Sequence, residues 1–98
     1  MTLKDLQKQA YKTATEKGWL DRQRSDGEVI ALIHSELSKT LEAMREGNPS
    51  SEKIPEISQV EEGLADTIIR ILDYAEQKQM DLDKAVTNTM EYNQSRSK

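Results

Sequence analysis

The sequence predicts an all-α protein, a four-helix bundle, and three observations carry this prediction. Apolar side chains recur at helical spacing over most of the 98 residues. Helix-starting signatures stand before the periodic segments that begin near residues 26, 59 and 82. No segment gives a strand signal, and the chain has only two prolines and no phenylalanine. Such a composition, 33% charged and 35% hydrophobic, is typical of helices that bury one side only.

The first two helices are predicted from their apolar stripes and from the glycines that end them. The first is expected over about residues 3–17, where Gly18 ends a stripe formed by Leu3, Leu6, Ala10 and Ala14. A polar loop, GWLDRQRSDG, comes next. Ser25 and Glu28 then have the spacing of a capping box, so the second helix should begin there and run to about Glu46, ending at Gly47.

The last two helices are separated from the first pair by a connection rich in Pro and Ser, GNPSSEKIPEI. Ser58 and Glu61 repeat the capping-box spacing, and the third helix should continue to about Lys78. Asp81 is a suitable N-cap for a fourth helix over residues 82–95. The third helix is apolar over more than half of its circumference, which indicates more than one packing partner and a position central to the bundle or to a subunit interface.

Size and charge limit the class of protein. A chain of 98 residues forms one domain and buries only about 60–65% of its unfolded surface, so oligomerisation is expected to complete its core. It has no cysteine, which excludes disulfides and thiolate sites. A net charge of −4 argues against a nucleic-acid polymer as partner. Charges close to the start and the lack of a long apolar run predict a cytoplasmic protein that does not engage a membrane.

Two acidic positions stand out on the helices. Glu36 falls within the broad apolar arc of the second helix, where a carboxylate is costly unless it is paired, protonated or bound to a cation. The third helix has a narrow polar sector that holds Glu62, Asp66, Arg70 and Asp73. This sector is either a solvated strip with an Asp66–Arg70 pair or one side of a cleft that faces Glu36.

The end of the fourth helix carries Asn93 and Arg96 on the same stripe as its apolar residues. In one interpretation these two side chains reach the same cleft, Arg96 as a phosphate ligand and Asn93 as a hydrogen-bonding group. In the other they belong to a frayed, solvated helix end.

Several separated segments of the chain are similar to one known family. ALIHSELSKTLEAMREG, EEGLADTIIRILDYA and AVTNTMEYNQSR, with KGWLDRQRSDGEVIALIHSEL overlapping the first, closely resemble the MazG-like all-α nucleoside triphosphate pyrophosphohydrolases. The resemblance implies a single MazG-like domain over residues 1–98, assembled as a homodimer or homotetramer. It also implies a nucleotide-pool house-cleaning enzyme that converts a nucleoside or deoxynucleoside triphosphate and water to the monophosphate and pyrophosphate. The implied cofactor is Mg²⁺, with Mn²⁺ as a possible substitute.

The acidic motifs of this family are only half present. Its second helix carries E-x-x-E and its third E-x-x-D; Glu36 matches the first acid and Asp66 the last, which implies catalytic and metal-binding roles for both. Lys39 and Gly63 stand at the two other acidic positions. Glu62, one helical turn from Asp66, is the candidate substitute ligand.

The family's substrate contacts carry over in part. Asn93 and Arg96 match, and Trp19 matches an aromatic residue that can contact the base. Thr89 stands where a lysine is expected ahead of the Tyr-Asn pair.

Two accounts explain the departures. In the first, the enzyme is divergent but active: Lys39 contacts phosphate in place of a second cation, and Gly63 lets ligand approach the helix backbone. In the second, the site has decayed, Lys39 simply pairs with Glu36, and the chain is a nucleotide-binding or helical assembly module.

Overall fold

The computed structural model describes residues 1–96, and this part of the chain is all-α. Its four helices are α1 (Leu3–Glu16), α2 (Asp26–Arg45), α3 (Gln59–Gln77) and α4 (Leu82–Ser95). The all-α prediction is therefore confirmed, and each predicted boundary lies within about two residues of the observed one. No helix within residues 1–96 combines the length and the apolar character needed to cross a membrane.

The helix ends form through the local signals that the sequence carries. Ser25 accepts from the Glu28 N–H and Ser58 from the Glu61 N–H, and both capping boxes are complete. The Asp81 carboxylate caps α4 by accepting from the Lys84 N–H. Gly18 (φ 73°) and Gly47 (φ 88°) follow α1 and α2 in the left-handed conformation, which glycine adopts without a steric cost.

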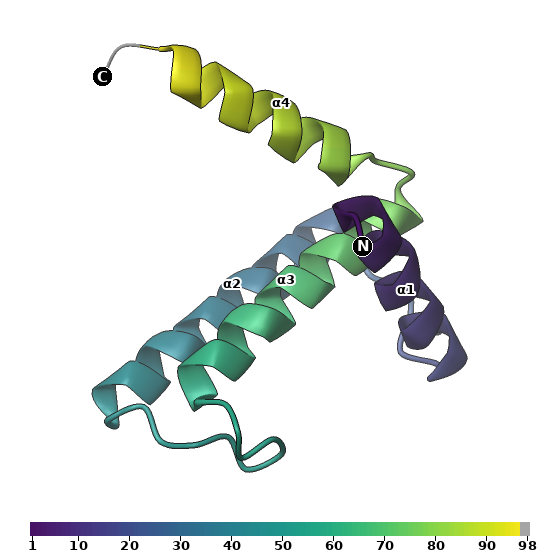
Figure 1. Cartoon of the computed structure of the whole chain (residues 1–98). Helices are drawn as coiled ribbons and strands as arrows, with labels where there is room; N and C mark the ends of the chain where they lie inside the picture. The colour runs from purple at the N-terminus through teal and green to yellow at the C-terminus, as the bar shows by residue number, and fades with distance from the viewer. Residues whose placement is uncertain (97–98) are drawn as a thin grey trace.

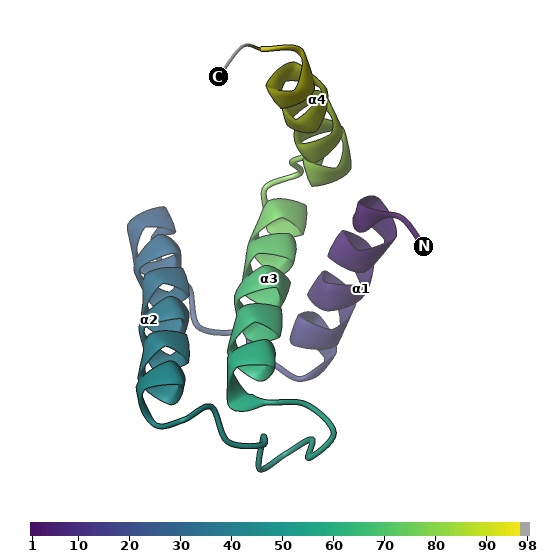
Figure 2. The same ribbon diagram turned by 60° about the vertical axis from the view of Figure 1, so that its left-hand side comes forward.

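Helix α3 lies between α1 and α2, as its wide apolar arc predicts (Figure 1). α2 and α3 are antiparallel neighbours joined by the 46–58 loop, and α1 packs on the other side of α3 (Figure 2). Helix α4 extends away from this three-helix layer and meets the rest of the chain mainly at α1. One chain alone therefore does not close all four helices into a single bundle.

The direction of α4 is set by a buried glutamine. Gln7 on α1 is 1% exposed, and its Nε2 donates to the Glu76 carboxylate at 3.0 Å and to the Met80 carbonyl at 2.8 Å. Its Oε1 accepts from the Leu82 N–H, the first of α4, at 3.0 Å. One side chain thus fixes the corner between α3 and α4, where Gln79 adopts a positive φ of 58°.

The hydrophobic core of the single chain is small. The buried apolar residues are Ala14, Ile33, Ala43, Leu72 and Ala75. The accessible surface is 7561 Å², whereas a compact monomer of this mass exposes about 5,700 Å². The radius of gyration is 15.4 Å, against about 13 Å for a compact domain of this length. Large apolar side chains consequently remain exposed on α2, α3 and α4.

Candidate functional site

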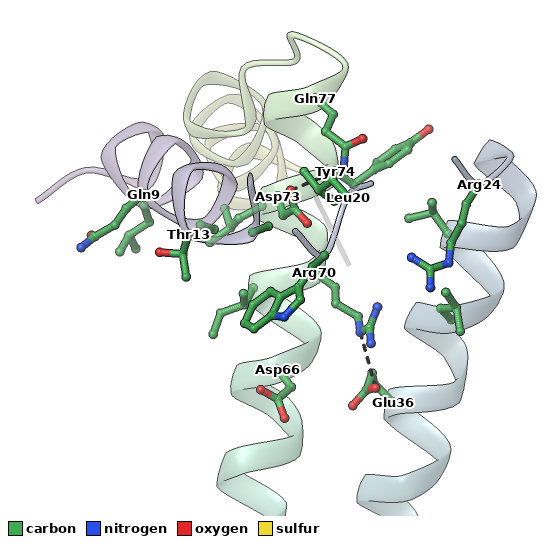
Figure 3. A pocket seen from close by; sticks show the side chains of 18 residues that line it. Gln9, Thr13, Leu20, Arg24, Glu36, Asp66, Arg70, Asp73, Tyr74 and Gln77 are labelled. Atoms are coloured by element: carbon green, nitrogen blue, oxygen red, sulfur yellow. Dashed lines mark hydrogen bonds and ion pairs between the residues drawn. The ribbon is translucent and has the colours of Figure 1, made fainter. Parts of the chain in front are cut away.

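A pocket of about 800 Å³ lies between α1, the loop after it, α2 and α3 (Figure 3). Its polar lining comes from separate elements: Arg24 from the loop, Glu36 from α2, and Asp66, Arg70 and Asp73 from α3. Trp19 lines it too and is 61% exposed, so its ring is accessible to a ligand. Three of the predicted site residues, Trp19, Glu36 and Asp66, therefore meet in one pocket.

The Glu36 side chain is largely enclosed, with 14% of its surface exposed. Its Oε1 is 3.4 Å from Arg70 Nε on α3 and 3.7 Å from Lys39 Nζ one turn away on α2. The i, i+3 pair of Lys39 with Glu36 is thus present. Arg70 forms its ion pair across the helices with Glu36, not with Asp66 as the solvated-strip interpretation expects, because the two helices face each other at this level.

Asp66 lies in a negative environment. Its partial burial raises the pKa of the carboxyl above the ordinary value, and the charges of Glu36 and Glu62 raise it further. The cationic groups of Lys53 and Arg70 offset part of this effect. Asp66 is therefore held close to two other carboxylates, an arrangement that a bound cation or a proton stabilises.

Glu62 is tied to the loop between α2 and α3. Its carboxylate accepts a hydrogen bond from the Ser51 hydroxyl and lies 3.7 Å from Lys53 Nζ. It lines a second, smaller pocket of about 330 Å³ with Lys39, Lys53 and Gly63. Glu62 thus anchors the loop. To bind a metal ion, its carboxylate must give up its contact with Ser51 or with Lys53.

Ser51→Ala should destabilise the protein. Ser51 is 2% exposed, and its Oγ also accepts from the Lys53 N–H at 3.2 Å and the Ile54 N–H at 3.1 Å. Because the substitution leaves these groups without their partner, we expect the free energy of unfolding in urea to fall by about 1–3 kcal/mol. The matched control is Ser50→Ala, a change at the exposed neighbouring serine. Equal losses in the two variants would contradict the role of the Ser51 hydroxyl.

Gly63 is explained by helix packing. A Cβ at this position would lie 2.1 Å from Thr40 Oγ1 and 3.1 Å from Thr40 Cβ. Thr40 is buried and donates to the Glu36 carbonyl at 2.9 Å, and Thr67 donates to the Gly63 carbonyl at 2.8 Å. Close packing of α2 against the side of Gly63 that lacks a Cβ therefore accounts for the glycine without a ligand.

Asn93 and Arg96 are not brought to the pocket within one chain. Both lie near the far end of α4, which extends away from α2 and α3, and neither lines one of the two pockets described above. Thr89 is on the same detached helix. Any contact of these residues with ligand in the large pocket therefore requires α4 of another copy or a different position of α4.

The acid set of the pocket suits at most one divalent cation. Among residues 1–96, no group of three or more His, Asp or Glu side chains is arranged to hold a metal ion. Glu36 and Asp66 nevertheless face the same pocket, and their oxygens are the hard donors that Mg²⁺ prefers, with water and phosphate oxygens completing an octahedron. The residues thus fit a single ion and not a four-carboxylate cage, since Lys39 and Gly63 stand at the two positions where the resemblance leads one to expect further acids.

The sequence analysis missed two polar residues that line the pockets, Arg24 and Lys53, and one polar residue buried elsewhere in the fold, Gln7. Arg24 and Lys53 lie in loops without periodicity, where no local signal indicates which side chains turn toward a helix. Gln7 lies beside the apolar stripe of α1, and only this adjacency could have marked it as a buried residue.

No protein-family model, no curated protein and no solved structure matches this chain. The resemblance to MazG-like proteins therefore depends on the sequence segments quoted above.

Proposed function

We propose that this chain is a divergent MazG-like nucleoside triphosphate pyrophosphohydrolase that converts a (d)NTP and water to the (d)NMP and pyrophosphate. The observation that supports the proposal is the meeting of Trp19, Glu36, Asp66 and Arg70 in one pocket. An aromatic ring, two carboxylates and a guanidinium are the groups that a base, a hard cation and a phosphate require. The volume of about 800 Å³ lies within the usual range for small-molecule sites.

Each group has a role in this proposal. Glu36 and Asp66 hold one Mg²⁺, or Mn²⁺, which supplies polarisation of phosphate oxygens and a more acidic water. Arg70 and Lys39 exchange their ion pair with Glu36 for contacts with phosphate oxygens, where a guanidinium can bind two oxygens at once. Trp19 stacks on the base. Glu62 lies one turn from Asp66 and serves as a ligand only if its contact with Ser51 opens.

The assembly and setting belong to the same proposal. The chain is one MazG-like domain that completes a four-helix bundle of the pyrophosphohydrolase type as a homodimer or homotetramer. Asn93 and Arg96 bind substrate once α4 is placed by that assembly. The biological role is house-cleaning of the nucleotide pool in the cytoplasm.

A second candidate is a catalytically silent module that binds nucleotide or only assembles. The observation that favours it is the neutralisation of the acids by the chain itself: Glu36 pairs with Arg70 and Lys39, and Glu62 with Lys53. In this case phosphate binds to the cations without Mg²⁺, and no bond is broken.

Pyrophosphate release tests the proposal. The eight canonical NTPs and dNTPs are incubated with the folded protein, with and without Mg²⁺, beside Asp66→Asn. Release that needs Mg²⁺ and is lost in the variant supports the enzyme. Absence of release with all eight, in a protein that still binds nucleotide, supports the silent module instead.

Asp66→Asn should stabilise the protein at neutral pH while it removes activity. The folded state raises the pKa of Asp66, so ionisation of this carboxyl costs more in the folded than in the unfolded chain. The cost is absent below the ordinary value of 3.8, where both states are protonated, and is complete above the raised folded pKa. The gain in unfolding free energy should therefore grow as the pH rises through this window. If the variant were less stable than wild type at pH 7, and by the same amount at every other pH, this result would contradict the repulsion of Asp66 by Glu36 and Glu62.

A further inference from the structure

We propose that Asp73 selects the base of the bound nucleotide, and that it favours a base with an amino group at its outer edge, cytosine or adenine, over the keto bases uracil and hypoxanthine. Asp73 lines the large pocket, but the roles assigned above to Glu36, Asp66 and Arg70 leave it unused. The inference rests on the proposed function, because it places a nucleotide in this pocket, and it adds which bases that nucleotide carries.

Asp73 shares one face of α3 with Asp66. The two residues are seven positions apart, which is close to two full turns, so their side chains leave the helix in nearly the same direction. The helix rise separates them by about 10 Å along the axis. Figure 3 shows both carboxylates in the pocket, with Arg70 between them on the same helix. A ribose and a base bridge such a length, so a nucleotide with its phosphates at Asp66 brings its base to Asp73.

The Asp73 carboxylate has hydrogen-bonding capacity to spare. The residue is partly buried, and its one side-chain hydrogen bond within residues 1–96 is a long one, from Gln77 Nε2 to Oδ1 at 3.4 Å. None of the ion pairs formed by these residues includes Asp73. Because an ionised carboxylate offers about four acceptor sites, Oδ2 can accept from a donor on a ligand.

The surroundings of this carboxylate favour a ligand that donates. Burial raises the pKa of Asp73 above its ordinary value, because the ionised form loses hydration in the folded chain. The hydrogen bond from Gln77 and the charge of Arg70 offset part of this rise. An N–H group of a bound base would replace the lost water, whereas a keto oxygen would be repelled by the negative charge.

The bases differ in the group that they present at this edge. Cytosine and adenine carry an amine, which donates, whereas uracil and hypoxanthine carry a keto oxygen at the same place, which accepts. A carboxylate only accepts, so Asp73 distinguishes the two kinds of base. The Gln77 amide and the Tyr74 hydroxyl, which line the same end of the pocket, can each donate or accept and therefore tolerate both.

Arg24 would give the opposite preference. It also lines the pocket, and a guanidinium only donates, so it would favour a keto base. Arg24 comes from the loop before α2, and Figure 3 shows it on the α2 side of the pocket, whereas Asp73 projects from α3. The direction of the base preference therefore distinguishes the two residues.

The affinities of dCTP and dUTP analogues test the proposal. Each analogue has an imido group between its α- and β-phosphorus atoms, which blocks the bond that the proposed reaction breaks, and Trp19 fluorescence in the presence of Mg²⁺ gives the Kd. Since a hydrogen bond to a charged group corresponds to about 10- to 100-fold in affinity, wild type should bind the dCTP analogue more tightly by about this factor.

Asp73→Asn should remove most of this preference, because an amide can donate to the keto oxygen as well as accept from the amine. The substitution keeps the shape of the side chain and removes a charge that the folded chain disfavours, so the variant should fold. Asp21→Asn is the matched control. It removes the same charge at an exposed position of the loop that carries Trp19, outside the pocket lining, and should keep the wild-type ratio.

The outcomes separate this inference from the proposed function. Equal affinities of the two analogues for wild type, a preference for the dUTP analogue, or an unchanged ratio in Asp73→Asn would overturn the role of Asp73 alone. If neither analogue bound to folded wild type, both the inference and the proposed function would fail.

The purine pair keeps the test decisive if Asp73→Asn fails to fold. The imido analogue of dATP should bind wild type more tightly than that of dITP, because adenine has an amine where hypoxanthine has a keto oxygen. Equal affinities of these two analogues, or tighter binding of the dITP analogue, would overturn the inference without the use of any variant.

Discussion

Gly63→Ala should lower the free energy of unfolding by about 1–2 kcal/mol, although alanine is the better helix former. Helix propensity favours the substitution by about 1 kcal/mol. The new Cβ, however, would lie 2.1 Å from Thr40 Oγ1, and overpacking of a tight contact costs about 1–3 kcal/mol or more. Thr40 is buried and cannot move away without losing its hydrogen bond to the Glu36 carbonyl. The steric cost of the new Cβ should therefore outweigh the gain in helix propensity.

The matched control is Gly27→Ala in the first turn of α2. A Cβ there meets only Ser25 Oγ, at 4.0 Å, so this variant should be neutral or more stable. Thermal or urea unfolding of the two variants measures the difference.

Gly63→Glu, which creates the acid that the MazG-like pattern expects, should be destabilised at least as much and should not gain activity. A stable Gly63→Glu with improved activity would mean that the α2–α3 contact opens readily.

Gln7→Leu should be the second strongly destabilised variant. It removes all three hydrogen bonds of a side chain that is 1% exposed, and it leaves the Met80 carbonyl and the Leu82 N–H without their partner. Since each buried group left unpaired costs about 1–3 kcal/mol, we expect a loss of about 2–4 kcal/mol in unfolding free energy. Hydrogen exchange at the Leu82 amide should also become faster, because α4 loses its fixed direction.

Gln9→Leu is the control for this prediction, because Gln9 is exposed and two residues away on the same helix. It should change the unfolding free energy by about 0.5 kcal/mol or less. If Gln7→Leu behaved like Gln9→Leu, the corner between α3 and α4 would not depend on the glutamine.

The helices could be predicted because their signals are local. The serine and acid of each capping box lie three residues apart, and the glycines after α1 and α2 act on the turn that precedes them. The central position of α3 also followed from its own sequence, because a wide apolar arc requires two partners.

The arrangement of the helices depends on contacts between distant residues, and here the sequence was insufficient. Gln7 acts on residues more than 70 positions away, so no window of sequence shows that α4 is turned outward. The resemblance puts Gly63 at an acidic position of the ligand motif, and its neighbours on α3 do not reveal what packs against it. The residue that explains it, Thr40, is on the other helix.

The candidate site could be predicted only in part, because some of its contacts also join residues that are distant in the sequence. Glu36 stands out because it falls within the apolar arc of its helix, and Asp66 because it lies in the narrow polar sector of α3. Trp19 is marked only by the resemblance, which matches it to an aromatic residue. The ion pair between Arg70 and Glu36 could not be predicted, since it requires the angle and register of α2 on α3. Whether Asn93 and Arg96 reach the pocket depends on the position of α4, which their own helix does not specify.

The central claim is that the pocket lined by Trp19, Glu36, Asp66 and Arg70 binds a nucleoside triphosphate. Trp19 is the single tryptophan of the chain, so its fluorescence reports on this pocket alone. Titration with a dNTP should produce a saturable change that Mg²⁺ strengthens, and Asp66→Asn should remove the effect of Mg²⁺. Unchanged fluorescence with every canonical NTP and dNTP at millimolar concentration, in a folded protein, would contradict the claim.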